Sequence, residues 1–251
     1  MLRFAVLGFP ISHSRSPEIY APMFRGAGLE AEFLRIPVKA VEAGRIRGIA
    51  EELDGFAITM PLKLAAIPYL DGLAPSAAAC GAVNIVEKRG GLLIGHNTDG
   101  TGLVDALLES GFDPAGKTAA ILGRGGAARA AKYALEKHGC SVRYLVRSLR
   151  AGDEKLIENV LNGEDGFSAE LFINAAPLGM EEGERFTYFE LPVRLGSELV
   201  FDMVYRPGGE TELVRTTRSR GVPAIGGEEL LYRQAVRAFE IWTGLKPVRL
   251  T

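Results

Sequence analysis

The sequence is poor in cysteine and histidine. Its 251 residues include two cysteines and three histidines. Cys80 and Cys140 lie far apart and form no CxxC pair, which argues against a disulfide framework. His13, His96 and His138 share no ligand spacing, so the sequence predicts no metal site. Two reduced thiols are typical of a cytoplasmic protein.

Excess positive charge and long apolar runs are also missing. Lysine and arginine number 29 against 31 acidic residues, giving a formal net charge of -2. Such a balance offers no broad attraction to nucleic acid or to an anionic membrane. No run approaches the ~18 apolar residues of a membrane span, and Gly8 and Pro10 interrupt the first apolar stretch too early for a signal peptide. We expect a cytoplasmic chain that binds neither nucleic acid nor membranes.

The first hundred residues alternate between strand and helix patterns. Branched apolar runs predict strands at residues 4–8, 32–38 and 55–60, and a hairpin over 82–96 that turns at Gly90-Gly91. Helical spacing occupies residues 17–28, 39–53 and 63–70. This alternation predicts an α/β domain with a mainly parallel sheet covered on both faces.

A second unit of the same class follows. Further strands are predicted at residues 118–123, 141–147, 169–175 and 198–205, with helices at 209–219 and 228–243. We place a domain boundary near residue 100. Residues 1–100 would form the first domain, residues 101–226 the second, and a C-terminal helix within 227–251 would return to complete the first.

The strongest general motif is a glycine-rich turn between a strand and a helix, "GRGGAA" at 123–128. Gly123 permits a tight turn, Gly125 lets a phosphate approach the backbone, and the helix N-terminus near Gly126 favours a pyrophosphate. This context indicates dinucleotide binding; the alternative is a plain turn. Arg124 has two interpretations, a phosphate contact or a solvated side chain.

The end of the next strand indicates which dinucleotide binds. An NAD site usually has an acidic residue there, which accepts from the ribose 2′-hydroxyl. Here the chain reads "LVRSLR", with Arg147 at the strand end. A guanidinium suits a 2′-phosphate, which favours NADP.

Hydroxyl side chains gather before the helix predicted at 17–28. Ser16 as N-cap and Pro17 in the first turn are explained by helix capping alone. Ser12 and Ser14 add hydroxyls outside the helix end, as a site for a small carboxylate would require. Both interpretations fit the sequence.

Other polar residues have an ordinary interpretation beside a functional one. Lys63, after the strand at 55–60, is either solvated or a cation at a site. Asp99 is either a turn residue or faces a substrate. Gln234 on the last helix pairs with backbone or with a ligand, and Tyr205 belongs to the core or to a pocket.

The motifs together resemble the shikimate dehydrogenase family across essentially the whole chain. The resemblance rests on "AVLGFPISHSRSP", "ITMPLK", "GAVNIV…GHNTDGTGL", "LGRGGAARA", "FINAAPLGM", "VFDMVYRPGGETEL" and "GG…LLYRQAVRAFEIWTG". It implies a two-domain enzyme of aromatic amino-acid biosynthesis that reduces 3-dehydroshikimate to shikimate with NADPH, as a monomer or homodimer.

The resemblance also implies roles for individual residues. Lys63 and Asp99 match the catalytic pair, without deciding which of them donates the proton. The implied substrate-binding residues are Ser14, Ser16, Thr59, Asn84, Tyr205 and Gln234, with both serines at the substrate carboxylate. The implied NADP-binding residues are Gly123, Gly125, Gly126, Ala127, Arg147 and Gly227.

Some positions depart from the family pattern. Val146 replaces a common asparagine before Arg147, Ala176 replaces a threonine, and Phe9 replaces another asparagine. Three alternatives therefore stay open: a quinate/shikimate dehydrogenase using NAD, a dehydrogenase acting on another ring, and a non-catalytic paralogue.

The segment 148–168 is short for a complete nucleotide-binding unit. Its apolar periodicity predicts one helix from about Asp153 to Leu161, and the remaining "EDGFS" is too short for a packed strand. The sequence therefore predicts an abbreviated or missing edge strand and a more open wall beside the adenine.

Overall fold

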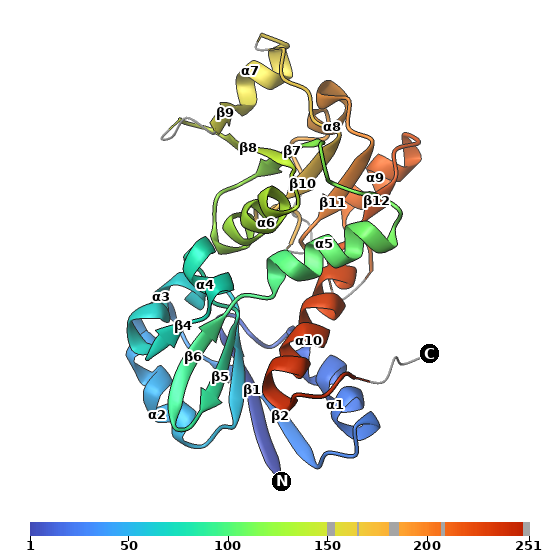
Figure 1. The fold of residues 1–251 in the computed structure, drawn as a ribbon. Helices are drawn as coiled ribbons and strands as arrows, with labels where there is room; N and C mark the ends of the chain where they lie inside the picture. The colour runs from blue at the N-terminus through green and yellow to red at the C-terminus, as the bar shows by residue number, and fades with distance from the viewer. Residues whose placement is uncertain (150–153, 165, 181–185, 207–208, 248–251) are drawn as a thin grey trace. The chain divides into compact units, whose positions relative to one another are not determined.

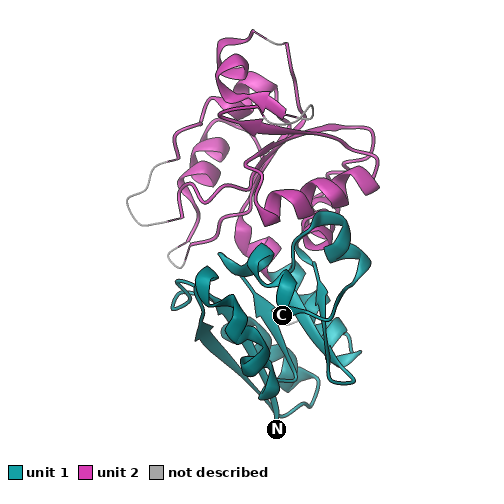
Figure 2. Ribbon diagram, turned by 90° about the vertical axis from the view of Figure 1, so that its left-hand side faces the viewer, with its two compact units in different colours: residues 1–99, 232–251 teal, residues 100–231 magenta. Residues whose placement is uncertain are grey.

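The computed structural model describes residues 1–149, 154–164, 166–180, 186–206 and 209–247. The chain divides into two compact units, residues 1–99 with 232–251 and residues 100–231 (Figure 2). The changes from one unit to the other occur at the start of α5 (Asp99–Glu109) and within α10 (Gly227–Thr243).

The first unit has a six-stranded mixed sheet (Figure 1). Its strands are β1 (Leu2–Gly8), β2 (Ala31–Pro37), β3 (Gly55–Ile58), β4 (Gly72–Leu73), β5 (Ile85–Arg89) and β6 (Leu92–His96), in the order β2-β1-β3-β5-β6-β4. β1 pairs in parallel with β2 and β3, while β5 is antiparallel to β3 and β6. The predicted hairpin turn is confirmed, since Gly90 and Gly91 have φ of 58° and 85°.

Helices cover both faces of this sheet, as the alternation predicted. α1 (Ser16–Gly26) and the C-terminal part of α10 pack on the face that carries Phe4 and Val6. The opposite face packs against η1 (Ala40–Arg45), α2 (Ile46–Glu51), α3 (Leu62–Ala65), η2 (Ile67–Tyr69) and α4 (Pro75–Cys80). The helix predicted over 63–70 is divided into α3 and η2, because Pro68 has no N–H to continue an α-helical ladder.

The last helix returns to the first unit, which confirms the expected architecture. Ala235, Ala238 and Phe239 are fully buried in the cluster that contains α1. The Trp242 indole donates to the Val86 carbonyl at 3.0 Å. It lies so close over Gly55 that a Cβ there would be 2.7 Å from the ring, which explains the glycine.

The second unit has a six-stranded sheet in which all paired strands are parallel over the described ranges. It contains β7 (Thr118–Leu122), β8 (Ser141–Val146), β9 (Glu154–Leu156), β10 (Leu171–Asn174), β11 (Leu199–Asp202) and β12 (Ala224–Ile225), in the order β12-β11-β10-β7-β8-β9. This is the strand order of a doubly wound nucleotide-binding sheet. α5 and α6 (Gly126–Lys137) cover one face, and α7 (Ile157–Asn162), α8 (Leu191–Leu195) and α9 (Glu212–Ser219) cover the other.

The edge strand beside β8 is abbreviated, as predicted, but it lies before the helix and not after it. β9 has three residues and pairs in parallel with β8, and α7 begins only at Ile157. The prediction of a helix from Asp153 was therefore wrong for 154–156, and Asp153 itself lies outside the described residues. The open edge of β8 supplies backbone partners to this segment, and Glu154 is anchored by an ion pair with Arg124.

Two strands end earlier than the apolar runs suggested. β11 stops at Asp202 and not at Tyr205, because the Asp202 carboxylate accepts the Val204 N–H at 3.1 Å in place of a ladder bond. β3 stops at Ile58, two residues before the predicted end.

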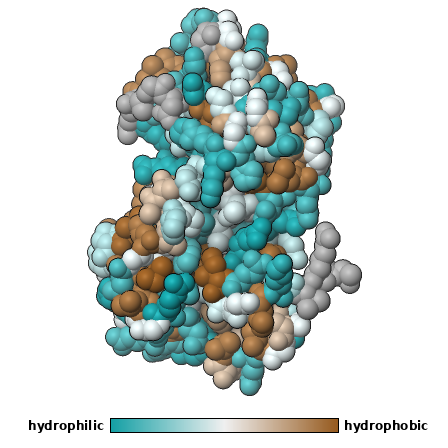
Figure 3. Space-filling view, viewed as in Figure 1, coloured by the Kyte–Doolittle hydropathy of each residue, from teal (hydrophilic) through white to brown (hydrophobic). Residues whose placement is uncertain are grey.

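In the part of the chain that the structure describes, no helix is both long enough and apolar enough to cross a bilayer. On the face drawn in Figure 3, hydrophobic residues form small groups among hydrophilic ones.

Candidate functional site

One edge of the first unit's sheet gathers the polar residues that the sequence singled out. β1, β3 and β6 all end at this edge, and the antiparallel β5 begins there. The serines therefore follow β1, Thr59 and Lys63 follow β3, and Asp99 follows β6. Residues far apart in the chain meet because parallel strands present their carboxyl ends together.

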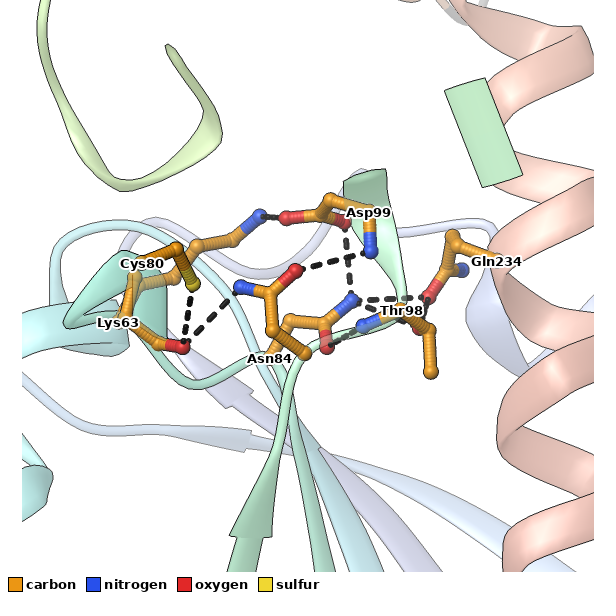
Figure 4. A network of polar contacts seen from close by, with 8 residues as sticks. Lys63, Cys80, Asn84, Thr98, Asp99 and Gln234 are labelled. Atoms are coloured by element: carbon orange, nitrogen blue, oxygen red, sulfur yellow. Dashed lines mark hydrogen bonds and ion pairs between the residues drawn. The ribbon is translucent and has the colours of Figure 1, made fainter. Parts of the chain in front are cut away.

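Lys63 and Asp99 form an ion pair (Figure 4). α3 carries Lys63, whose Nζ donates to Asp99 Oδ2 at the first residue of α5. The other carboxylate oxygen, Oδ1, accepts from Asn84 Nδ2 at 2.9 Å. The Lys63 side chain is 20% exposed and that of Asp99 is 7% exposed, so the ammonium is the more accessible member of the pair.

Asn84 is the centre of a buried network. Its Oδ1 accepts the Thr98 N–H at 2.8 Å, which fixes the orientation of its carboxamide. Its Nδ2 lies 3.0 Å from Thr98 Oγ1 and 3.3 Å from Gln234 Oε1. The network thus joins Lys63, Asp99, Asn84 and Gln234, all predicted from the sequence, and adds Thr98. Thr98 lies within the quoted "HNTDG", but a threonine beside two turn residues gave no separate signal.

The interpretation of Ser16 as an N-cap was wrong. α1 begins at Ser16, and Arg15 occupies the cap position without a side-chain cap hydrogen bond. The Ser14 and Ser16 hydroxyls are instead hydrogen-bonded to each other at 3.1 Å, and both residues are buried. Arg35 Nε donates to the Ser14 backbone carbonyl at 2.8 Å, so a guanidinium, itself ion-paired with Glu18, lies beside these serines. Paired hydroxyls next to a cation can bind a carboxylate.

The remaining substrate candidates are positioned differently. Thr59 is half-buried directly after β3, and its backbone N–H donates to Leu7 at 2.9 Å. Its methyl group packs against Gly8, where an added Cβ would lie 2.4 Å from it. Tyr205 is half-buried on the loop after β11 and belongs to the second compact unit.

The glycine-rich turn of the second unit has the geometry that a pyrophosphate requires. Gly123 has φ of 97°, which a residue with a side chain rarely adopts. Gly125 is the N-cap of α6, and an added Cβ there would meet no described atom within 4 Å. Gly126 and Ala127 open a helix of 12 residues, whose first N–H groups have no side-chain cap.

Arg124 and Arg147, the two arginines near this turn, differ in their ion pairing. Arg147 follows β8 at the same edge, is exposed, and forms no ion pair with any described residue. Arg124 Nη1 lies 2.9 Å from the buried Glu154 carboxylate, so its guanidinium is paired within the protein and not simply solvated; its contact with a phosphate stays a prediction. A 2′-phosphate at Arg147 would therefore displace no ion pair within the described ranges, and this contact stays a prediction.

Gly227 has a packing reason to be glycine. A Cβ at this first residue of α10 would lie 2.5 Å from the Val204 carbonyl oxygen and 2.8 Å from that of Met203. The close approach joins the start of α10 to the loop that carries Tyr205. Its assignment to cofactor binding stays a prediction.

Asp202 is a buried carboxylate that the sequence analysis did not single out. It is 0% exposed and accepts from Asn174 Nδ2 at 2.9 Å and from Thr211 Oγ1 at 2.6 Å. Burial raises the pKa of Asp202 to about 6, and the hydrogen bonds from Thr211, Val204 and Asn174 oppose that rise. An aspartate at a strand end is a common turn residue, so its burial had no sequence signal.

This raised pKa predicts a specific dependence of stability on pH. The folded state holds the Asp202 proton more tightly than the unfolded state, whose pKa is near 3.8. The stability that this proton contributes is complete below pH 4 and is lost as pH rises through about 6. Asp202→Asn should therefore gain stability relative to wild type by about 2 kcal/mol more at pH 7 than at pH 4.5. Urea unfolding of both proteins at the two pH values checks this. Parallel pH–stability curves would contradict it.

Within the described ranges, no group of three or more histidine, cysteine, aspartate or glutamate residues could hold a metal ion.

The sequence of this chain is similar to those of known proteins. The sequence profile of the "Shikimate dehydrogenase substrate binding domain" matches residues 6–86. The "Shikimate dehydrogenase (NADP(+))" of Rubrobacter xylanophilus is 37% identical over 259 residues, which cover 96% of this chain and 90% of that protein.

Solved structures give the same result. Shikimate 5-dehydrogenase from Thermus thermophilus, in complex with NADP(H) and shikimate, has a TM-score of 0.85 at 34% identity, covering 99% of this chain and 95% of that one. Shikimate 5-dehydrogenase from Listeria monocytogenes, in complex with shikimate and NAD, has a TM-score of 0.78 at 30% identity, covering 98% and 93%. The chain belongs to the family of NADP-dependent shikimate dehydrogenases.

Proposed function

We propose that this chain reversibly reduces 3-dehydroshikimate to shikimate, with Lys63 as the proton donor and Asp99 as the group that holds it. The observation that carries the proposal is the ion pair between them, which is continuous with the buried amides of Asn84 and Gln234. A cation held beside buried polar groups suits the reduction of a carbonyl, because it stabilises the negative charge that develops on the oxygen.

The chemistry assigns distinct tasks to the two residues. NADPH, when bound, supplies the hydride. The carbonyl oxygen then gains negative charge, which the Lys63 ammonium stabilises before it transfers a proton to that oxygen. Asp99 accepts on both of its oxygens, from Lys63 and from Asn84, so it acts as an acceptor and an anchor. In the oxidation of shikimate, Lys63 takes the proton back.

The surrounding residues fit a small hydroxylated carboxylic acid. We assign Ser14 and Ser16 to the carboxylate, because their buried hydroxyls lie together beside Arg35. Asn84 and Gln234 present amides to ring hydroxyls. Thr59 and Tyr205 keep the substrate-binding role that the family resemblance implies.

The residues of the second unit fit NADP. We assign the pyrophosphate to the turn and helix start formed by Gly123, Gly125, Gly126 and Ala127. Arg147 supplies the cation for the 2′-phosphate, since it is exposed and has no ion-pair partner in the described ranges.

Two alternatives are separated by substrate and cofactor. The relative from Listeria monocytogenes was crystallised with NAD, which keeps a quinate/shikimate dehydrogenase using NAD as the second candidate. A non-catalytic paralogue is disfavoured, because such a protein has no need of a joined lysine–aspartate pair. We further propose a cytoplasmic location, since both cysteines are buried free thiols, and a monomer or homodimer.

Steady-state assays test the function. Shikimate and quinate should each be offered with NADP and with NAD, at matched protein concentration. We expect oxidation of shikimate with NADP and much slower turnover in the other three combinations. Folded protein without NADP-dependent activity on shikimate would contradict the proposal.

A further inference from the structure

Arg35 lies next to the serines assigned to the substrate carboxylate, and the sequence analysis did not single it out. It is on the edge strand β2, where its register partner on β1 is Val6. Phe33, two residues earlier on the same face of the strand, packs in the cluster that contains α1. The Arg35 side chain therefore extends over the face of the sheet that α1 covers.

Two contacts hold the Arg35 guanidinium at the start of α1. Nη2 forms an ion pair with Glu18 in the first turn of the helix, and Nε donates to the Ser14 backbone carbonyl at 2.8 Å. Burial opposes ionisation of Glu18, but the hydrogen bond from Arg35 helps to bring its pKa below the usual value. The Glu18 carboxylate is therefore ionised at neutral pH and offsets the charge of the guanidinium. The hydrogen bond to Ser14 is then the contribution of Arg35 that bears on the serines.

The backbone of Ser14 is tied to the sheet by this hydrogen bond. Ser14 precedes α1, so its carbonyl takes no part in the hydrogen bonds of the helix. Its N–H donates to the Ile11 carbonyl at 3.1 Å, within the same loop. Its carbonyl accepts from Arg35, which is 21 residues away in the sequence. The contact with Arg35 thus fixes the loop against a strand.

The position of Ser14 determines the geometry of both hydroxyls. Ser14 Oγ donates to Ser16 Oγ at 3.1 Å and accepts the Ser16 N–H at 3.4 Å. To bind a carboxylate, each hydroxyl has to turn its hydrogen toward it, which needs only rotation about the Cβ–Oγ bonds. The two oxygens must keep their places during that rotation. A fixed Ser14 backbone therefore prepares the site for its ligand.

We propose that Arg35 is a positioning residue for the substrate carboxylate. It acts through the Ser14 carbonyl, holds the Ser14 and Ser16 hydroxyls where the carboxylate binds, and is not itself a substrate contact. The carboxylate is remote from the reacting carbonyl, so these hydroxyls bind ground state and transition state alike, and their displacement raises KM without lowering kcat. The inference rests on the proposed role of the two serines.

Arg35→Met tests this, because it keeps an unbranched side chain on β2 and removes the guanidinium. The KM for shikimate should rise about three- to tenfold, as expected for the loss of one hydrogen bond that orients a binding group. The kcat should stay within about twofold, and the KM for NADP should not change. In a Ser14→Ala/Ser16→Ala background, Arg35→Met should have no further effect on the KM for shikimate, because no hydroxyl is left to position.

Two control variants separate this role from the general effects of removing an ion-paired residue. Arg3→Met removes a guanidinium of similar exposure from the neighbouring strand β1, where Arg3 pairs with Glu32 and Glu52, and should leave the KM unchanged. Glu18→Gln removes the ion pair of Arg35 but leaves its hydrogen bond to Ser14, and should keep the KM within about twofold of the wild-type value.

The results that would overturn the inference differ from those that would overturn the role of the serines. An unchanged KM in Arg35→Met, together with a raised KM in Ser14→Ala/Ser16→Ala, refutes the positioning role alone. The same holds if the effect of Arg35→Met persists in full without the serine hydroxyls, or if Arg3→Met or Glu18→Gln raises the KM equally. If Ser14→Ala/Ser16→Ala leaves the KM unchanged, the proposed role of the serines fails, and the positioning role fails with it.

Discussion

Lys63→Ala should lower kcat by roughly 10²-fold or more and leave the binding of shikimate within a modest factor. The reason is that a positioned proton donor contributes about 10²–10⁴-fold to such a step, while the hydroxyls and amides of the pocket remain to bind substrate. Steady-state kinetics measure kcat, and a separate titration of shikimate measures binding.

Two additions make this experiment specific. Lys246→Ala removes an exposed lysine of the same unit and should leave kcat unchanged. Adding methylamine to Lys63→Ala should restore part of the lost rate, because it supplies an ammonium where the side chain ended. A near wild-type kcat in Lys63→Ala would contradict the proposal that Lys63 donates the proton.

Arg147→Asp should weaken the binding of NADP about ten- to a hundredfold and the binding of NAD far less. The preference of the protein for NADP over NAD should therefore become smaller. A charge-assisted hydrogen bond to phosphate is worth ~1.5–3 kcal/mol, which corresponds to that range. Arg147 is exposed and forms no ion pair with a described residue, so the substitution breaks no ion pair within the described ranges. Titrating the protein with NADP and with NAD gives the two binding affinities, and their ratio measures the preference.

Arg194→Asp controls for the change in charge. It makes the same substitution at an exposed position of α8, in the same compact unit, and should leave the NADP:NAD ratio near its wild-type value. If Arg147→Asp leaves that ratio unchanged, the 2′-phosphate must be bound elsewhere. The next candidates are Arg124, which would have to exchange its ion pair with Glu154 for the phosphate, and Arg150, which lies outside the described residues.

The fold could be predicted from the sequence where side chains alternate or where an apolar run is complete. Phe4 and Val6 face one core while Ala5 and Leu7 face the other, which is the pattern that indicated a strand covered on both faces. β9 could not be predicted. Its three residues include Glu154, a buried carboxylate that pairs with Arg124, 30 residues earlier in the chain. The local hydrophobic periodicity does not depend on such a distant partner, so it could not predict this strand.

The site residues likewise divide into those that local sequence patterns predict and those that they do not. The glycine-rich turn and Arg147 follow from local chemistry, because a turn, a helix start and a strand end each have a residue signature. The roles of Lys63 and Asp99 do not follow from local chemistry, because a lysine after a strand and an aspartate in a turn are both ordinary. Only the family resemblance connected these two residues.

A crystal structure of the wild-type protein with shikimate is the most direct test of the assignment of this pocket. The substrate carboxylate should contact the Ser14 and Ser16 hydroxyls, and the ring hydroxyl that is oxidised should lie within hydrogen-bond distance of Lys63 Nζ. Shikimate bound with that hydroxyl away from Lys63, or bound outside the network of Asn84, Asp99 and Gln234, would contradict the proposed chemistry.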